Sequence, residues 1–125
     1  MDGQSAYELF ASLVDPAIRL EVDTYWAAVG GADVPAVLQR LGSQVAFLHI
    51  KDGPTTTDSA EGFRDRTFAL EQEPAGRGSM QFEPILAAAP AAVRVIEFDN
   101  YRGDIFDGIA ESYNFLSQAE AAGRL

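Results

Sequence analysis

The chain has 125 residues, 47% of them hydrophobic, and a formal net charge of −10. This length suits one domain with a buried core, and the hydrophobic fraction excludes a disordered chain. The acidic balance, without a cluster of Lys and Arg, argues against a nucleic-acid-binding surface, because phosphate contacts need clustered cations. Since there is no Cys, disulfides and thiolate metal sites are excluded. There is no long apolar run and no signal core at the start, so we expect a soluble, cytoplasmic protein that does not act at a membrane.

Seven elements are predicted in chain order, and they alternate between helix and strand. The apolar spacing predicts a helix at 5–16, a strand of roughly seven residues within 17–26, a helix at 32–42, a strand at 44–52, a helix at 82–90, a strand at 91–100 and a helix at 104–125. Ser5 with Glu8 predicts a capping box for the first helix, and Pro16 closes it. Asp33 and Gly42 predict the start and stop of the second helix. This order favours a parallel sheet with right-handed crossovers.

The segment Gly53–Met80 has only a weak pattern of its own. It carries four Gly, two Pro and three consecutive Thr. Long loops in compact domains are functional or disordered. An active-site lid and a disordered loop are therefore the two interpretations.

The three predicted strands place ionisable residues on one face, towards their carboxyl ends. Because side chains alternate between the two faces, Glu21 and Asp23 share one face with His49, Lys51 and Glu97. The opposite face is apolar and suits covering helices. Ligand sites gather at the carboxyl ends of parallel strands, so Asp23, His49 and Glu97 are expected to converge on one point. Two carboxylates and an imidazole suit Mn²⁺, Mg²⁺, Co²⁺ or Zn²⁺.

Each of these three residues also has a structural interpretation. His49 can be an ordinary histidine near a strand end, and Asp23 can cap the turn that follows it. Glu97 can pair with Arg94 or with Lys51. These alternatives stay open beside the metal site.

Two neighbours of the predicted site are also ambiguous. Glu21 lies one layer deeper than Asp23, and we expect it to pair inside the protein, with Lys51 or with a residue of a further strand. Trp26 and Tyr25 either stack on a sugar or pack at the rim of the sheet.

Four motifs, in this order, carry a resemblance to a known family: LEVDTYWAAVGGADV, FLHIKDGP, GRGSMQFEPIL and VIEFDNYRGD. Together they resemble the carboxyl-terminal part of the sugar phosphate isomerase/epimerase family, over nearly the whole chain. The resemblance implies an α/β fold of the xylose isomerase-like TIM-barrel type. Residues 1–125 would then be a single partial (β/α)8 domain with parallel strands, made of the last three βα units and a preceding helix.

The resemblance also implies a divalent metal held by four side chains on the last four barrel strands. Asp23, His49 and Glu97 match the Asp, the His and the second Glu of that set. Lys51 and Asp52 follow in the HIKD motif and would line the substrate site. The first Glu belongs to the fifth barrel strand, which this chain does not supply.

The implied activity is isomerisation or epimerisation of a sugar or sugar phosphate through an enediolate. The metal grips two neighbouring substrate oxygens, and two glutamates, one of them Glu97, take and return a proton beside the carbonyl. Trp26 is a further candidate substrate contact.

Two other functions stay open: a related metal-dependent polyol dehydratase, and a non-catalytic half-barrel that serves as an association module or is a remnant. A (β/α)8 barrel needs about 250 residues. We therefore expect a half-barrel that is incomplete as an enzyme and that forms a homo-oligomer or pairs with an amino-terminal half.

Overall fold

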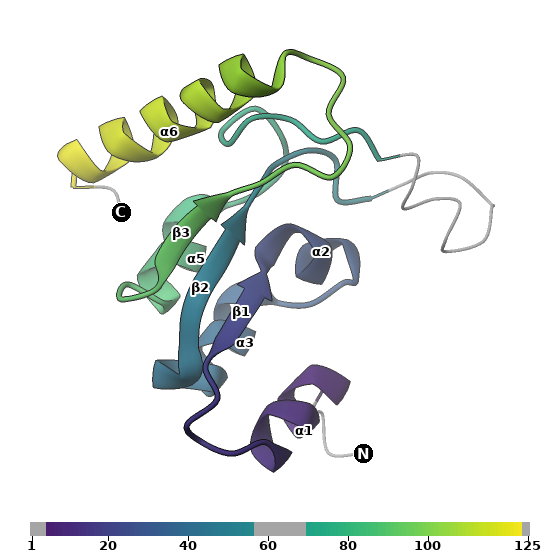
Figure 1. The fold of residues 1–125 in the computed structure, drawn as a ribbon, viewed down its shortest axis with the longest axis vertical. Helices are drawn as coiled ribbons and strands as arrows, with labels where there is room; N and C mark the ends of the chain where they lie inside the picture. The colour runs from purple at the N-terminus through teal and green to yellow at the C-terminus, as the bar shows by residue number, and fades with distance from the viewer. Residues whose placement is uncertain (1–4, 57–69, 124–125) are drawn as a thin grey trace.

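A parallel three-stranded sheet organises the part of the chain that the computed structural model describes, residues 5–56 and 70–123 (Figure 1). Strands β1 (Leu20–Asp23), β2 (Val45–Ile50) and β3 (Val93–Ile96) lie in the order β1-β2-β3. Both neighbouring pairs are parallel, and the sheet is open. The predicted α/β fold with parallel strands is confirmed at this level.

Helices precede and follow the strands along the chain. In the described ranges they are α1 (Ala6–Leu13), α2 (Thr24–Val29), α3 (Val34–Leu41), the short 3-10 helix η1 (Gly42–Gln44), α5 (Phe82–Ala88) and α6 (Ile105–Ala121). Helices α3 and α5 pack together behind the sheet, α1 contacts α3, and α6 contacts β3 (Figure 1). None of these helices is long and apolar enough to cross a membrane.

The helix starts follow the predicted caps. The Ser5 hydroxyl accepts a hydrogen bond from the N–H of Glu8, and the Glu8 carboxylate accepts one from the N–H of Ser5. The Asp33 carboxylate accepts the N–H of Ala36, and Gly42 ends α3 with a φ of 54°. These side chains satisfy N–H groups that the helix itself leaves without partners.

The strand predicted for 17–26 is wrong at its carboxyl end. Strand β1 covers only Leu20–Asp23, and the next six residues form helix α2. The Asp23 carboxylate accepts the N–H of Trp26 at 2.9 Å, so it caps this helix directly at the end of the strand. The aromatic residues that suit a strand by composition are therefore helical, because the cap decides the local conformation.

Two further elements end earlier than predicted. Helix α1 ends at Leu13, three residues before Pro16, and Val14 is already extended. Proline disfavours the helical conformation only at the preceding residue, Asp15, so it does not by itself explain a stop at Leu13. Strand β3 ends at Ile96, although the N–H of Glu97 still donates to Ile50 at 3.3 Å.

The core lies between the sheet and helices α3 and α5. The strand residues of the core cluster are Val22, Val45, Leu48 and Ile50, and the helices add Val34, Leu38, Phe82, Ile85 and Leu86. The prediction of an apolar, helix-covered face is confirmed. Burial of these side chains is the main stabilising contribution available to the fold.

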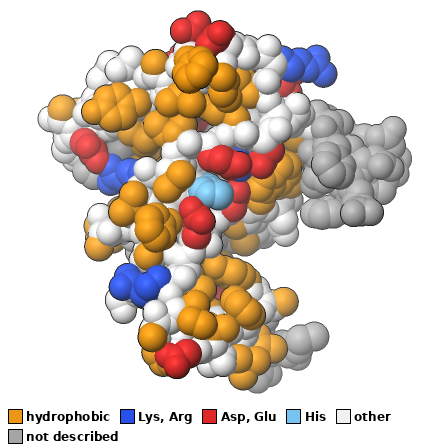
Figure 2. All heavy atoms as spheres, in the orientation of Figure 1, with side chains coloured by type: hydrophobic (Ala, Val, Ile, Leu, Met, Phe, Trp, Pro, Cys, Tyr) orange, Lys and Arg blue, Asp and Glu red, His pale blue; other side chains and the backbone are white. Residues whose placement is uncertain are grey.

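The other face of the sheet faces the viewer in Figure 2 and carries no helix of the described residues. Phe47 and Val93 lie on it side by side and are 43% and 55% exposed. The single His of the chain, His49, lies among carboxylates near the middle of this surface. The polar and apolar parts of this face are thus adjacent, with the polar part at the carboxyl ends of the strands.

The two ends of the segment Gly53–Met80 are joined beside β2. Asp52 and Glu73 form an antiparallel bridge with N–H···O distances of 3.1 and 2.9 Å. The N–H of Ser79 donates to Gly53 at 3.0 Å. Residues 57–69, on which the interpretations as a lid or a disordered loop mostly rest, lie outside the described residues.

Candidate functional site

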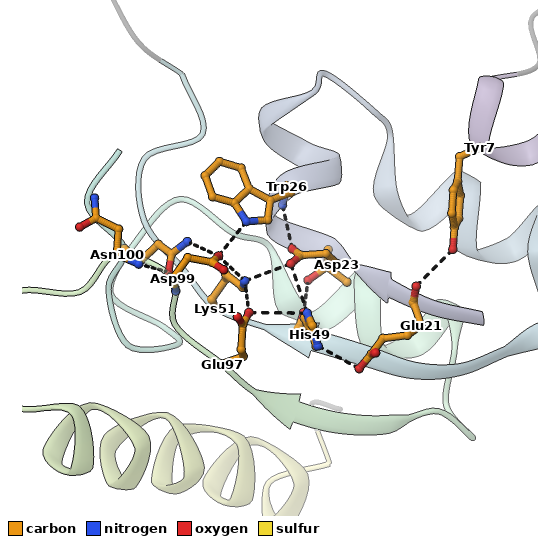
Figure 3. A network of polar contacts seen from close by, with 11 residues as sticks. Tyr7, Glu21, Asp23, Trp26, His49, Lys51, Glu97, Asp99 and Asn100 are labelled. Carbon is orange, nitrogen blue, oxygen red and sulfur yellow. Dashed lines mark hydrogen bonds and ion pairs between the residues drawn. The ribbon is translucent and has the colours of Figure 1, made fainter. Parts of the chain in front are cut away.

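The structure brings together the three residues that were predicted to converge (Figure 3). Asp23 ends β1, His49 lies in β2 as its register partner, and Glu97 directly follows β3. One potential ligand atom from each lies within 4.8 Å of the others. Parallel strands in register place these side chains at one edge and on one face, which is the geometric basis of the prediction. Metal binding by them stays a prediction.

His49 lies between three carboxylates. Its Nε2 is 2.9 Å from Glu21, and its Nδ1 is 3.3 Å from Asp23 and 3.5 Å from Glu97. A neutral imidazole has one N–H, whereas carboxylates only accept hydrogen bonds. If Nε2 donates to Glu21, an unprotonated Nδ1 would face two acceptor oxygens. A cation placed between Nδ1 and the two carboxylates would satisfy these atoms together.

Glu21 pairs with His49, and the expectation that it pairs with Lys51 is wrong. Its backbone is in register with Phe47, one layer below His49, so its carboxylate reaches up to Nε2. A metal-binding His commonly donates its second ring N–H to a carboxylate, which fixes the orientation of the ring. Glu21 occupies that position relative to His49.

Asp23 uses its two oxygens for different partners. Oδ1 accepts the N–H of Trp26 and caps α2. Oδ2 lies 3.3 Å from His49 and 3.0 Å from Lys51. The capping interpretation and the ligand interpretation are therefore compatible, because each needs a different oxygen.

Lys51 lies in the middle of the carboxylates with only 1% of its surface exposed. Its Nζ is 3.0 Å from Asp23 and 2.6 Å from Asp99, and it forms an ion pair with Glu97. Burial opposes the charged form, but the contacts with Asp99, Glu97 and Asp23 outweigh it and raise the pKa of Lys51. These contacts favour the ammonium form of Lys51.

The partner of Glu97 is settled by the same contacts. Of the two open pairings, the one with Lys51 is present, whereas Arg94 forms an ion pair with Glu120 of α6. Apart from its ion pairs, the buried Oε2 of Glu97 receives no hydrogen bond from the described residues.

Sequence reasoning did not single out Asp99 and Gln72, which complete the cluster. Oδ2 of Asp99 accepts hydrogen bonds from Lys51, Gln72 and Trp26 at 2.6, 2.9 and 2.8 Å. Burial acts to raise the pKa of Asp99, but these three donors lower it far below its usual range. In the predicted strand 91–100, Asp99 falls on the same face as Glu97, which was an available signal. Gln72 lies in the patternless segment, where no signal marked it.

Trp26 lies at the edge of the cluster (Figure 3). Its indole N–H donates to Asp99, and its ring meets Tyr25 edge-on at a centroid distance of 5.1 Å. The Tyr25 ring is buried and its hydroxyl donates to Pro54, so packing is the correct interpretation for that residue. Contact between Trp26 and a sugar stays a prediction.

Asp52 has a different place from the predicted substrate site. It is fully buried, and its carboxylate accepts the N–H groups of Gly53, Gly76 and Met80 at 2.8 to 2.9 Å. A side chain at Gly78 would overlap Asp52 and the backbone of Gly53. Asp52 therefore holds the ends of the long segment together, and its oxygens are occupied by backbone.

The donor set fits a divalent cation in its chemistry. Two carboxylates and one imidazole provide the oxygen and nitrogen ligands that Mn²⁺, Mg²⁺, Co²⁺ and Zn²⁺ accept. The buried Oε2 of Glu97 has ion pairs but no hydrogen bond from the described residues, and a cation would add a partner to it. The ammonium of Lys51 lies against the same carboxylates and competes with such a cation.

Comparisons with protein-family models, with curated proteins and with solved structures found no match to this chain. The resemblance to the sugar phosphate isomerase/epimerase family therefore rests on the four sequence motifs alone. The positions of Asp23, His49 and Glu97 are an independent observation, because they come from strand register and side-chain geometry.

Proposed function

We propose that this chain supplies three ligands of a divalent metal site in a sugar or sugar-phosphate isomerase or epimerase. The observation that carries the proposal is the convergence of Asp23, His49 and Glu97 at the carboxyl edge of a parallel sheet. Ligands of α/β sheets and barrels bind at that edge. The four motifs point to the same three residues. In this proposal the sheet represents the last three strands of a (β/α)8 barrel, and its open face belongs to the barrel interior.

The residues have separate roles in the proposed reaction. When bound, the metal would stabilise the negative charge that develops as a proton leaves a carbon beside a carbonyl. Glu97 is the carboxylate that moves this proton. Asp23 and His49 hold the metal, and Glu21 fixes the imidazole ring through Nε2. A second proton-transferring glutamate, which the family resemblance calls for, has no counterpart among the matched residues.

A non-catalytic association module is the second candidate. The observation that favours it is the uncovered sheet face, where Phe47 and Val93 are exposed beside a cluster that Lys51 already partly neutralises. A metal-dependent polyol dehydratase would use the same site as the isomerase and would differ in its product.

Titration calorimetry with Mn²⁺ tests the metal site directly. We expect one Mn²⁺ to bind to the unaltered chain and Glu97→Gln to weaken binding by at least about 10- to 100-fold, because the loss of a residue that only orients a ligand already costs that much. Glu83→Gln, an exposed carboxylate in the first turn of α5, is the matched control and should leave binding unchanged. Identical traces for Glu97→Gln and the unaltered chain would refute the site.

Exchange of substrate protons in D₂O separates the candidate functions. With Mn²⁺ and a panel of ketoses, aldoses and their phosphates, NMR should show slow exchange beside the carbonyl, because one base suffices to remove a proton. Glu97→Gln should abolish this exchange and Glu83→Gln should retain it. Loss of water from a cyclic polyol would identify the dehydratase. Metal binding without any reaction would favour the association module.

A further inference from the structure

We propose that Lys51 is the resident cation of this cluster and sets how tightly a divalent metal binds. The inference rests on the proposed function, because it concerns the same ligands. It goes further because it identifies a group of the protein itself, the ammonium of Lys51, that competes with the metal for ligand oxygens. The competition follows from which oxygens the ammonium contacts and from what holds it there.

The ammonium and the metal would share the same two oxygens. Nζ of Lys51 contacts Oδ2 of Asp23 at 3.0 Å and forms an ion pair with Oε2 of Glu97. These are the oxygens that face Nδ1 of His49 at 3.3 and 3.5 Å. In Figure 3 both carboxylates are joined by dashed lines to Lys51 and to His49. A metal on Asp23, His49 and Glu97 must therefore displace the ammonium from two of its partners.

Asp99 provides the position to which the ammonium can withdraw. It binds Nζ at 2.6 Å, and Gln72 and Trp26 hold the same oxygen at 2.9 and 2.8 Å. Gln72 is fully buried and also accepts the N–H of Asp99 at 2.7 Å. Asp99 is thus fixed by contacts that do not involve the metal ligands, so Lys51 can keep this partner while it gives up the other two.

Charge adds to the competition. A divalent cation bound at these oxygens lies close to a buried ammonium, and like charges repel more strongly away from water. Removing the charge of Lys51 takes away both the repulsion and the competition for ligand oxygens. Removing Asp99 should weaken metal binding, because the ammonium then depends on Asp23 and Glu97 alone.

The double variant Lys51→Met/Asp99→Asn is the sharpest test, since it removes one charge of each sign and leaves the three ligands intact. We expect Mn²⁺ to bind this variant about tenfold more tightly than the unaltered chain in titration calorimetry. Lys51→Arg, which keeps the charge, should not gain affinity. Equal or weaker binding by the double variant would overturn the inference.

Asp99→Asn alone gives a second measurement with the opposite sign. We expect it to bind Mn²⁺ more weakly than the unaltered chain, and unchanged or tighter binding would count against the inference. This variant decides the matter if circular dichroism shows that the double variant does not fold. If the unaltered chain and both variants fail to bind Mn²⁺, the proposed function fails and this inference with it. Equal binding by all of them overturns the inference alone.

Discussion

At the scale of single residues, the carboxylate of Asp23 caps helix α2 and also takes part in the polar cluster around Lys51 and His49. Oδ1 caps α2 through the N–H of Trp26, and Oδ2 faces Lys51 and His49. The two oxygens of one carboxylate point in different directions, so neither role interferes with the other. Substitutions that keep only the cap can separate the roles.

Comparison of Asp23→Asn with Asp23→Ala isolates the cap. Both variants lose the charge beside Lys51, but Asn still accepts the N–H of Trp26. We expect Asp23→Ala to unfold with a free energy about 1 kcal/mol lower than Asp23→Asn, measured in urea. Both should lose Mn²⁺ binding. Equal stability of the two variants would show that the cap contributes nothing.

Gly78 is a second residue with a defined structural need. A Cβ at this position would overlap Asp52 and the backbone of Gly53, which are themselves buried. We expect Gly78→Ala to lower the free energy of unfolding by about 1–3 kcal/mol, as overpacking does in a close-packed interior. The control is Gly30→Ala, where φ is −71° and a Cβ meets its nearest neighbours at 3.3 Å. A loss at Gly30 as large as that at Gly78 would contradict this reason.

At the scale of elements, helix α1 buries Glu8 and Ala11, while its large apolar side chains are exposed. Glu8 is buried and forms an ion pair with Arg40 of α3, within the capping box with Ser5. Leu13 and Phe10 of the same helix are exposed. Helical spacing predicted the helix correctly but did not show which side is buried, because that depends on the neighbouring helix.

The attachment of α1 should depend on pH. Arg40, followed by Ser5, lowers the pKa of Glu8 from 4.5 to about 2. A carboxyl whose pKa is lower in the folded state stabilises the fold fully above about pH 4.5, and this contribution is lost as pH falls towards 2. Urea unfolding should therefore show a stability difference between the unaltered chain and Glu8→Gln at pH 7 that shrinks between pH 4.5 and 2. A constant difference would contradict the role assigned to Glu8.

At the scale of the whole molecule, one sheet face is covered and the other is open. Helices α3 and α5 cover one side, whereas the side with Phe47, Val93 and the polar cluster is accessible (Figures 1 and 2). Contiguous exposed apolar patches are typical of interaction sites. We therefore expect self-association, or binding of a complementing partner, to occur through this face.

Sedimentation velocity tests self-association through this face. We expect the unaltered chain to associate with rising concentration and Phe47→Ser/Val93→Ser to remain monomeric, because the exposed apolar area is reduced. Ile18→Ser changes an exposed apolar residue outside the sheet and should not alter association. Monomers at all concentrations for every variant would rule out a homo-oligomer of this kind.

The sequence by itself determined the order of the three strands and of helices α1, α3, α5 and α6, the caps at Ser5 and Asp33, and the face on which Asp23, His49 and Glu97 lie. These features depend on local spacing and on the alternation of side chains along a strand, which are readable without knowledge of the neighbours. The convergence of the three residues could be predicted for the same reason.

Only the tertiary structure decided the partners within the cluster. Glu21 meets His49 because of the register between β1 and β2, and Lys51 meets Asp99 because Gln72 holds that carboxylate from a distant segment. Helix α2 was also missed, since its start depends on the direction of one carboxylate oxygen. Contacts of this kind arise from register and packing between distant parts of the chain, and periodicity carries no information about them.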